Sequence, residues 1–355
     1  MSPQSIDAAF SPPIVIRRGG TYRGAWYSSD PKVSAITIET SEPVTIRDSV
    51  VVGVGNLIYG RNVNGIIENV SGFGIGSRPG KFLDLTVDRH LDVVQNRMSN
   101  VWGIRISGTG ENKLLPRLNL RRNFSYNLRD GLETHSHFIQ LVGGTFPGAQ
   151  ILENIAINAP WRSHVEDVIN IYDARGTPTD PIQIKENKIL GAYPPDPAND
   201  SFSGGGIIVD GGSNSTPDSA SAYVQIENNI VIATTNYGIA LAAGNHNSVR
   251  GNTIVSSGMV SSTIPSRAQN VGLYIWNLYK QSEHVFFDNA AFENEIHWMK
   301  VSSPNARDQV LNPMWLPDCQ KEARLCANVV LSRSRKLTDA MQIETSLVRR
   351  YFGND

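Results

Sequence analysis

The sequence has few charges, no excess of basic residues and no long apolar run. Charged residues make up 18% of the 355 residues, and 32 Lys and Arg face 33 Asp and Glu, for a formal net charge of −1. A nucleic-acid-binding protein needs a basic excess to contact phosphates, so we expect no nucleic-acid partner. No apolar run approaches the roughly 20 residues of a membrane-spanning helix, so we expect no membrane partner either.

Cysteine is almost absent. The chain contains only Cys319 and Cys326, seven residues apart, and no metal-binding spacing such as Cys-x-x-Cys. One local disulfide between them fits an extracellular or periplasmic setting. Residues 1–13 lack the basic segment and apolar stretch of a signal peptide. We expect a secreted, periplasmic or cell-surface protein, although the chain shows no signal peptide.

Glycine and asparagine are abundant, with 31 Gly and 30 Asn. Both residues accept left-handed backbone conformations and form tight turns. Both are also poor helix formers. The composition therefore predicts a chain that turns often and is not dominated by long helices.

A four-residue pattern recurs, in which an apolar residue is followed by two variable residues and an asparagine. The copies are Ile66–Asn69, Val93–Asn96, Leu120–Asn123, Ile151–Asn154, Ile184–Asn187, Ile226–Asn229, Val249–Asn252 and Phe286–Asn289. A repeat near 23 residues with insertions of variable length explains the spacing of the asparagines. We expect these asparagines to form structural ladders at turns and to have no part in chemistry.

A second element follows most of these asparagines, usually a glycine and then alternating apolar residues. The copies are Gly74-Ile75, Gly103–Ile106, Gly131–Thr134, Gly206–Val209, Gly238–Leu241 and Gly272–Ile275, and Val168–Ile171 fits without its glycine. Short strands at a repeated spacing, with no helical pattern between them, predict a solenoid of stacked strands.

This pattern resembles the right-handed parallel β-helix of the pectate-lyase-like superfamily over residues 14–300. Segments 166–173, 204–212 and 270–277 are similar to bacterial β-helix repeat proteins. The resemblance implies an all-β fold in which each coil stacks on the last, apolar side chains fill the core and asparagines form ladders. The paired-Asp and His-Gly signatures of polygalacturonases are absent from the sequence, and so is a pectate lyase calcium site.

The ends of the chain differ from its middle. We expect a single domain, 1–355, in which residues 1–13 cover the first coil, 14–300 form the coils and 301–355 form an extension. Leu337, Ala340, Met341, Leu347, Val348 and Tyr351 recur at helical spacing. They predict a helix over about 337–351 with Thr338 as a possible N-cap, either capping the solenoid or packed against its side.

Strand alternation decides which side chains face outward. Successive side chains of a strand point to opposite faces, so Ile104 and Ile106, and Ile169 and Ile171, are expected inside. Two outward columns result. The first contains Arg105, Glu133, Asn170, Ile208, Ala240 and Tyr274, and the second contains Ser107, His135, Tyr172, Asp210, Ala242 and Trp276.

These columns combine charged, titratable and aromatic side chains, as recognition of a polysaccharide requires. Long insertions before Val168, Gly206 and Gly272 are expected to wall the resulting groove. The candidate catalytic residues are Arg105, Glu133, His135, Tyr172 and Asp210. The candidate substrate-binding residues are Arg78, His137, Asn170, Asp173, Arg175, Tyr274 and Trp276.

Three functions fit these residues. The first is β-elimination on a uronic-acid polymer, with Arg105 or Arg78 as the cation and His135 or Tyr172 as base and acid. The second is inverting glycoside hydrolysis by Glu133 and Asp210, two coils or about 9.6 Å apart. The third is a non-catalytic carbohydrate-binding module of a phage tail or adhesin. No cofactor is expected; calcium is possible, but no carboxylate motif indicates it. The oligomeric state stays open.

Overall fold

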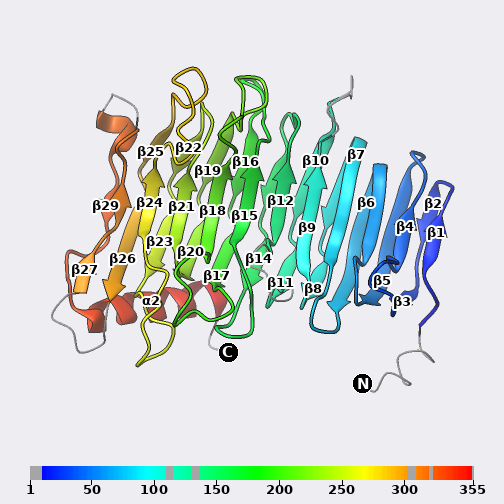
Figure 1. Cartoon of the computed structure of the whole chain (residues 1–355), viewed down its shortest axis with the longest axis horizontal. Helices are drawn as coiled ribbons and strands as arrows, with labels where there is room; N and C mark the ends of the chain where they lie inside the picture. Colours follow the sequence, from blue (N-terminus) through cyan, green and yellow to red (C-terminus); the bar gives the residue numbers. More distant parts are fainter. Residues whose placement is uncertain (1–9, 109–114, 130–135, 302–308, 320–322, 354–355) are drawn as a thin grey trace.

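The computed structural model describes residues 10–108, 115–129, 136–301, 309–319 and 323–353. Within these ranges the chain consists of strands, one α-helix, α2 (Leu337–Phe352), and one 3₁₀ turn, η1 (Ala323–Cys326). The strands follow the chain along the long axis of the molecule, from β1 near one end to β29 near the other (Figure 1). The expected all-β class is confirmed, and the long sheet is parallel almost throughout.

Most strands belong to one of three series, in which each strand pairs in parallel with the next member. The first series contains β9 (Trp102–Ser107), β12 (Ile139–Val142), β15 (Asp167–Tyr172), β18 (Gly205–Asp210), β21 (Tyr237–Leu241), β24 (Val271–Ile275) and β28 (Met314–Trp315). The second contains β10 (Arg117–Arg121), β13 (Gln150–Leu152), β16 (Ile182–Lys185), β19 (Val224–Glu227), β22 (Ser248–Arg250) and β25 (Ala290–Phe292). The third contains β8 (Arg97–Ser99), β11 (Phe124–Tyr126), β14 (Ile155–Ile157), β17 (Lys188–Ala192), β20 (Ile230–Thr234), β23 (Thr253–Ser256), β26 (Glu295–Val301) and β29 (Val329–Val330).

The strands at the N-terminal end connect to these series. They are β1 (Ile14–Ile16), β2 (Gly20–Tyr22), β3 (Ala25–Ser28), β4 (Ile36–Ile38), β5 (Val44–Gly53), β6 (Ile58–Gly74) and β7 (Lys81–Val94). The long strand β7 pairs with β9 of the first series near its start and with β10 of the second near its end. Near the other end, β27 (Gln309–Leu311) pairs antiparallel with β26.

The apolar core runs without a break along the stacked strands. Ile104, Ile106, Ile169 and Ile171 are at most 1% exposed and belong to one cluster that extends from Ile16 to Trp298. The equivalent residues of later strands are buried in the same cluster, namely Ile207, Val209, Ile239, Leu241, Leu273 and Ile275. The prediction that these side chains point into the core is therefore confirmed.

Buried asparagines form a ladder at the turn between the second and third series. Each side-chain amide donates to the side-chain oxygen of the next asparagine at 2.8–3.0 Å. The ladder contains Asn96, Asn123, Asn154, Asn187, Asn229, Asn252, Asn294 and Asn328. Such a ladder satisfies polar groups that the stacked turns bury.

One of the predicted ladder positions is wrong, and another belongs to a different ladder. Asn69 lies outside the ladder, because it precedes the ladder position by one residue. Val70 occupies that position instead. Asn289 belongs to a second, shorter ladder, in which it accepts from Asn247 at 3.1 Å. The residue before each ladder asparagine from Asn96 to Asn294, not the asparagine, has a left-handed backbone, as at Glu186 (φ 58°).

The C-terminal helix α2 packs against the side of the sheet. Leu337 and Ala340 are buried against Met259, Met299 and Val301, next to strands of the third series. Figure 1 shows α2 lying along one edge of the stacked strands and not across their end. The side-packed alternative is therefore correct, and the helix bounds match the prediction closely.

Thr338 is not the N-cap of α2. The helix follows Lys336, which makes no side-chain cap, and the first helical N–H, of Leu337, donates to Gln309 Oε1 at 2.7 Å. The expected disulfide between Cys319 and Cys326 is present. The described part of the chain contains no helix with the length and apolar character to cross a bilayer.

Candidate functional site

A cavity of about 610 Å³ opens on the outer face of the first series. Its floor comes from β15, β18, β21 and β24, and its walls come from the segments around 201–203, 267–270 and 276–279. Two of the expected long insertions, before Gly206 and before Gly272, supply the first two walls. The helix α2 packs on the third series and leaves this face uncovered.

The strand pairing corrects the first outward column. Gln140 of β12 pairs with Arg105 on one side and with Asn170 on the other. Gln140 thus occupies the position expected for Glu133, and Glu133 lies outside the described residues. Beyond Asn170 the column continues as expected through Ile208, Ala240 and Tyr274.

The second column changes in the same way. Val142 occupies the position expected for His135, which also lies outside the described residues. Tyr172 and Asp210 are paired neighbours, as predicted. Tyr172 is 37% exposed, whereas Asp210 is 9% exposed because Tyr279 covers it and donates a hydrogen bond to its Oδ1.

Two carboxyl groups meet at the cavity floor. The side-chain amide nitrogen of Asn170 donates to Asp167 Oδ2 at 3.1 Å and to Asp210 Oδ2 at 3.2 Å. Both carboxyl groups line the cavity, and all three residues are buried. A single amide therefore holds two acidic side chains close together at the base of an open cavity.

The cavity acids have perturbed ionisation. Burial raises the pKa of Asp167 to about 8, with further contributions from the nearby charges of Glu166 and Asp210. Burial also raises the pKa of Asp210, against the hydrogen bonds that it accepts from Tyr279, Gly211 and Asn170. Perturbed acids of this kind concentrate at functional sites.

Tyrosines surround these acids. Tyr237 donates a hydrogen bond to Asp167 Oδ1, and Tyr274 contacts the Tyr237 ring edge-on with centroids 5.5 Å apart. Burial raises the pKa of Tyr237 well above its ordinary value, so its hydroxyl stays protonated as a donor. Ala240 and Ala242, members of the two outward columns, are fully buried in an outer cluster with Tyr274.

Asp167 was missed by the sequence analysis because the strand alternation slips at the start of β15. Val168 and Ile169 are consecutive, yet both belong to the core cluster. The slip turns Asp167 outward, although its spacing from Ile169 predicts an inward side chain. The sequence contains one sign of this slip, because the consecutive apolar residues Val168 and Ile169 do not fit a strictly alternating strand.

The same slip occurs in neighbouring strands and creates a third outward row at their starts. Phe138 and Ile139 are both in the core, as are Phe82 and Leu83. We call this third row the entry row. It contains Lys81, Trp102, His137, Asp167, Gly205 and Tyr237.

Side chains of the entry row contact their neighbours. The Lys81 ammonium lies 3.7 Å from the centre of the Trp102 ring, and that ring lies 6.1 Å from His137. His137 Nδ1 lies 2.9 Å from the main-chain oxygen of Asp167. Gly205 leaves the space in which Tyr237 reaches Asp167. The entry row therefore begins at the Lys81 cation and continues to Asp167, one of the two cavity acids.

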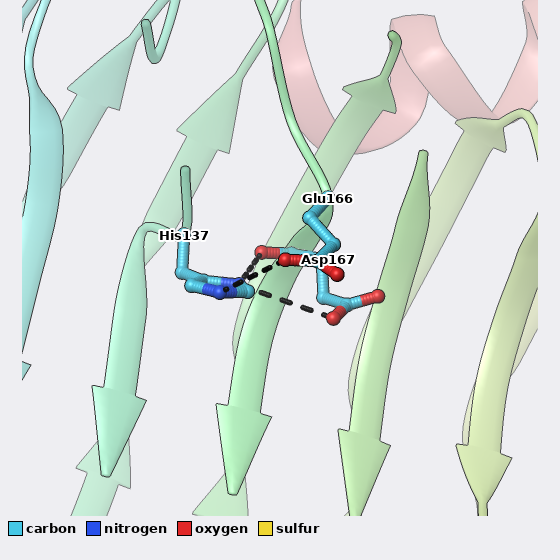
Figure 2. Close-up of side chains that lie close together, drawn as sticks. All are labelled: His137, Glu166 and Asp167. Carbon is cyan, nitrogen blue, oxygen red and sulfur yellow. Dashed lines mark hydrogen bonds and ion pairs between the residues drawn. The ribbon is translucent and has the colours of Figure 1, made fainter. Parts of the chain in front are cut away.

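His137 is 2% exposed and faces two carboxylates (Figure 2). Its Nε2 lies 3.5 Å from Glu166 Oε2, and its Nδ1 lies 3.9 Å from Asp167 Oδ2. One ligand atom from each of the three residues lies within 4.8 Å of the others. His137 was expected to bind substrate, but its position beside two acids makes it a candidate metal ligand.

The predicted cations lie away from the cavity. Arg105 Nη1 is 3.5 Å from Asp84 Oδ1, and Asp84 occupies the paired position one strand earlier. Arg78, the other predicted cation, is an exposed residue of the turn between β6 and β7. Among the described residues, the cation that lines the cavity is instead Arg267.

Asp173 and Arg175 hold a neighbouring loop. Asp173 accepts a hydrogen bond from Ser215 Oγ at 2.7 Å, and Arg175 donates to the carbonyl of Pro217 at 2.6 Å. Both side chains therefore fix the segment that follows β18. Neither contributes to the lining of the cavity.

Aromatic rings extend from the cavity toward the C-terminal end. Tyr274 and Trp276 both line the cavity, Tyr274 almost fully buried and Trp276 36% exposed. Trp315 pairs beside Tyr274 and lies 5.0 Å from Trp276 between ring centres. The two tryptophans form an exposed aromatic surface next to the acids.

Comparison with protein-family models, curated proteins and solved structures finds no match to this chain.

Proposed function

We propose that this chain is a right-handed parallel β-helix protein of the pectate-lyase-like type, and that it acts on a polysaccharide at the cavity of the first series. Three series of parallel strands, used in turn by successive strands of the chain, support the β-helix. The asparagine ladder and the continuous core support it as well.

The carboxyl groups of Asp167 and Asp210, held by one amide of Asn170, carry the functional proposal. Glycoside hydrolysis uses two acids, one to protonate the leaving oxygen and one as a carboxylate. Asp167 is the more enclosed acid, and its raised pKa agrees with the proton-donating role. Asp210 accepts hydrogen bonds from Tyr279, Gly211 and Asn170, which favour its charged form.

The spacing of the two acids favours retention of anomeric configuration. Their oxygens bond to a single nitrogen, which places them nearer the ~5–5.5 Å of a retaining pair than the ~6.5–9.5 Å of an inverting pair. In this proposal Asp210 attacks the sugar carbon, and water later releases the glycosyl group. Glu133, the partner of Asp210 in the inverting pair expected from the sequence, lies outside the described residues, and the proposal assigns the second acid to Asp167 instead.

The walls of the cavity suit a sugar chain. Trp276 offers an exposed ring for the weakly apolar face of a sugar. Asn236, Gln269 and Asn270 line the same cavity with amide donors and acceptors for hydroxyl groups. In this proposal a polymer lies across the cavity with sugars on both sides of the two acids.

Arg267 favours a second candidate, β-elimination on a uronic-acid polymer. Its guanidinium lines the cavity with the tyrosines, so it can face a uronate carboxylate while a tyrosine serves as the proton acceptor or donor. The non-catalytic alternative, a carbohydrate-binding module of a phage tail or adhesin, uses the same surface without chemistry.

A panel of neutral and uronic-acid polysaccharides tests these functions. New reducing ends without unsaturated product support hydrolysis. Ultraviolet absorbance from an unsaturated uronate supports elimination. If a polymer binds and neither product forms at any pH, the chain is a binding module and the proposed hydrolysis is wrong.

A further inference from the structure

We propose that His137, Glu166 and Asp167 form a site for a divalent transition-metal ion of the zinc or manganese type, at the edge of the cavity. The three side chains converge in Figure 2, from the start of β15 and from the residue before Phe138. This inference goes beyond the proposed function, and its main test needs no substrate.

The histidine is oriented as a ligand. Its Nδ1 lies 2.9 Å from the main-chain oxygen of Asp167, a group that can only accept, so Nδ1 carries the hydrogen. In the neutral imidazole, Nε2 then presents its lone pair toward Glu166 Oε2, 3.5 Å away. Metal-binding histidines are commonly fixed by this kind of contact to a carbonyl oxygen.

The distance between the first two ligand atoms suits one ion. Zinc lies about 2.0–2.2 Å from a histidine nitrogen or a carboxylate oxygen, so atoms 3.5 Å apart can share an ion without moving apart. Asp167 supplies the third carboxyl group, and one ligand atom from each of the three residues lies within 4.8 Å of the others. The Glu166 side chain is 40% exposed, so its carboxylate can be reached from solvent.

The charges around this site favour a cation. The charged groups that act most on Asp167 are the acids Glu166 and Asp210, and its hydrogen-bond donors Tyr237 and Asn170 are neutral. Glu166 and Asp167 also line the cavity, which gives an ion a path from solvent. An imidazole ligand selects zinc-like ions over calcium, which takes oxygen ligands.

Occupation of this site would affect the proposed hydrolysis. An ion on Asp167 occupies the carboxyl group that the mechanism needs as a proton donor. We therefore expect Zn²⁺ to inhibit the enzyme, a consequence that rests on the proposed function. The binding itself does not.

Calorimetric titration of the metal-free protein with Zn²⁺ tests the proposal, with His137→Gln and Glu166→Gln as the test variants. The matched control is His246→Gln, because His246 Nε2 also faces a carboxylate, Asp288, at 3.4 Å, but belongs to no three-residue cluster among the described residues. We expect one Zn²⁺ per wild-type chain, and affinity at least tenfold lower in both test variants.

The control should bind as the wild type does, and Ca²⁺ should fail to displace the ion. Because His137 is buried, Glu166→Gln keeps the test valid if His137→Gln does not fold. Three results would overturn the site: no binding, equal binding by Glu166→Gln, or displacement by equimolar Ca²⁺. Zn²⁺ binding in a chain with no glycan activity would overturn the proposed function and leave the metal site intact.

Discussion

Tyr237 reaches Asp167 across Gly205, which lies between them in the paired strands β15, β18 and β21. A side chain at Gly205 would place its Cβ 2.3 Å from the Tyr237 ring and 2.5 Å from Asp167 Oδ1. Because Gly205 has no side chain, it leaves the space in which Tyr237 hydrogen-bonds to Asp167. Gly205 has no ionisable group, but by admitting this hydrogen bond it affects the ionisation of Asp167.

Gly205→Ala should separate Tyr237 from Asp167 and destabilise the fold by about 1–3 kcal/mol through overpacking. Thermal unfolding measures the stability, and glycan turnover or binding measures the site. Gly212→Ala is the control, because a Cβ at that position would lie an ordinary 3.5 Å from its nearest neighbour, the Tyr172 hydroxyl. Equal effects of the two substitutions would contradict the importance of the gap.

The asparagine ladder should be costly to interrupt. Asn187 accepts from Asn154 and donates to Asn229 and to the carbonyl of Ile151, all buried. Asn187→Ala leaves these groups without partners, so we expect a loss on the order of 3 kcal/mol in the free energy of unfolding. Chemical denaturation measures it, with the exposed Asn199→Ala as a control expected within about 0.5 kcal/mol of wild type. A near-neutral Asn187→Ala would show that the ladder does not stabilise the fold.

The sequence predicted the strands, the core and most of the ladder, because these follow from periodicity. It failed where periodicity breaks. Asp167 faces the cavity only because Val168 and Ile169 both turn inward, and a two-residue rule assigns it to the core. The strand position expected for the segment with Glu133 is occupied by β12, whose Ile139 and Leu141 are buried in the core.

The remaining parts of the site depend on distant loops. Tyr279 and Arg267 reach the cavity from segments outside the strands, so their residue type and spacing gave no indication of where they would lie. Asn170, in contrast, was placed correctly on the outer face. Its role in bridging two acids became evident only when Asp167 was found beside it.

A buried acid should make helix docking depend on pH. Glu344 of α2 accepts a hydrogen bond from the Ser257 N–H at 2.6 Å, and enclosure of its carboxyl group raises its pKa from 4.5 to about 7. The folded state therefore binds a proton more tightly than the unfolded state. The contribution of Glu344 to stability is fully present below the pKa that this group has in the unfolded chain. It is lost as pH rises through the pKa that the group has in the folded protein.

We expect the melting temperature to fall between about pH 4.5 and pH 7 through this group, by the equivalent of roughly 1–3 kcal/mol. Glu344→Gln, which has no titratable group, should flatten this part of the pH profile. Glu295→Gln, an exposed acid on β26, is the control and should keep the wild-type profile. An unchanged slope in Glu344→Gln would show that the carboxyl group ionises normally.

Replacement of Asp167 and replacement of Asp210 should affect glycan turnover in different ways. Asp167→Asn removes the proposed proton donor, and Asp210→Asn removes the proposed attacking carboxylate, so each should lower glycan turnover by about 10²–10⁴-fold. The loss in Asp167→Asn should be smallest for substrates whose leaving group departs without protonation, such as activated aryl glycosides. Asp210→Asn gains no such relief, because the carboxylate acts at the sugar carbon and not at the leaving oxygen.

The control for the two acids is Tyr172→Phe. Tyr172 lies next to Asp210 on the same face but is 37% exposed and does not line the cavity, so the variant should stay within a few-fold of wild type. Turnover of natural and activated substrates by the three variants, compared with the wild type, measures the difference. Equal losses on both substrate types by Asp167→Asn would contradict its role as the proton donor, even if the cavity is the active site.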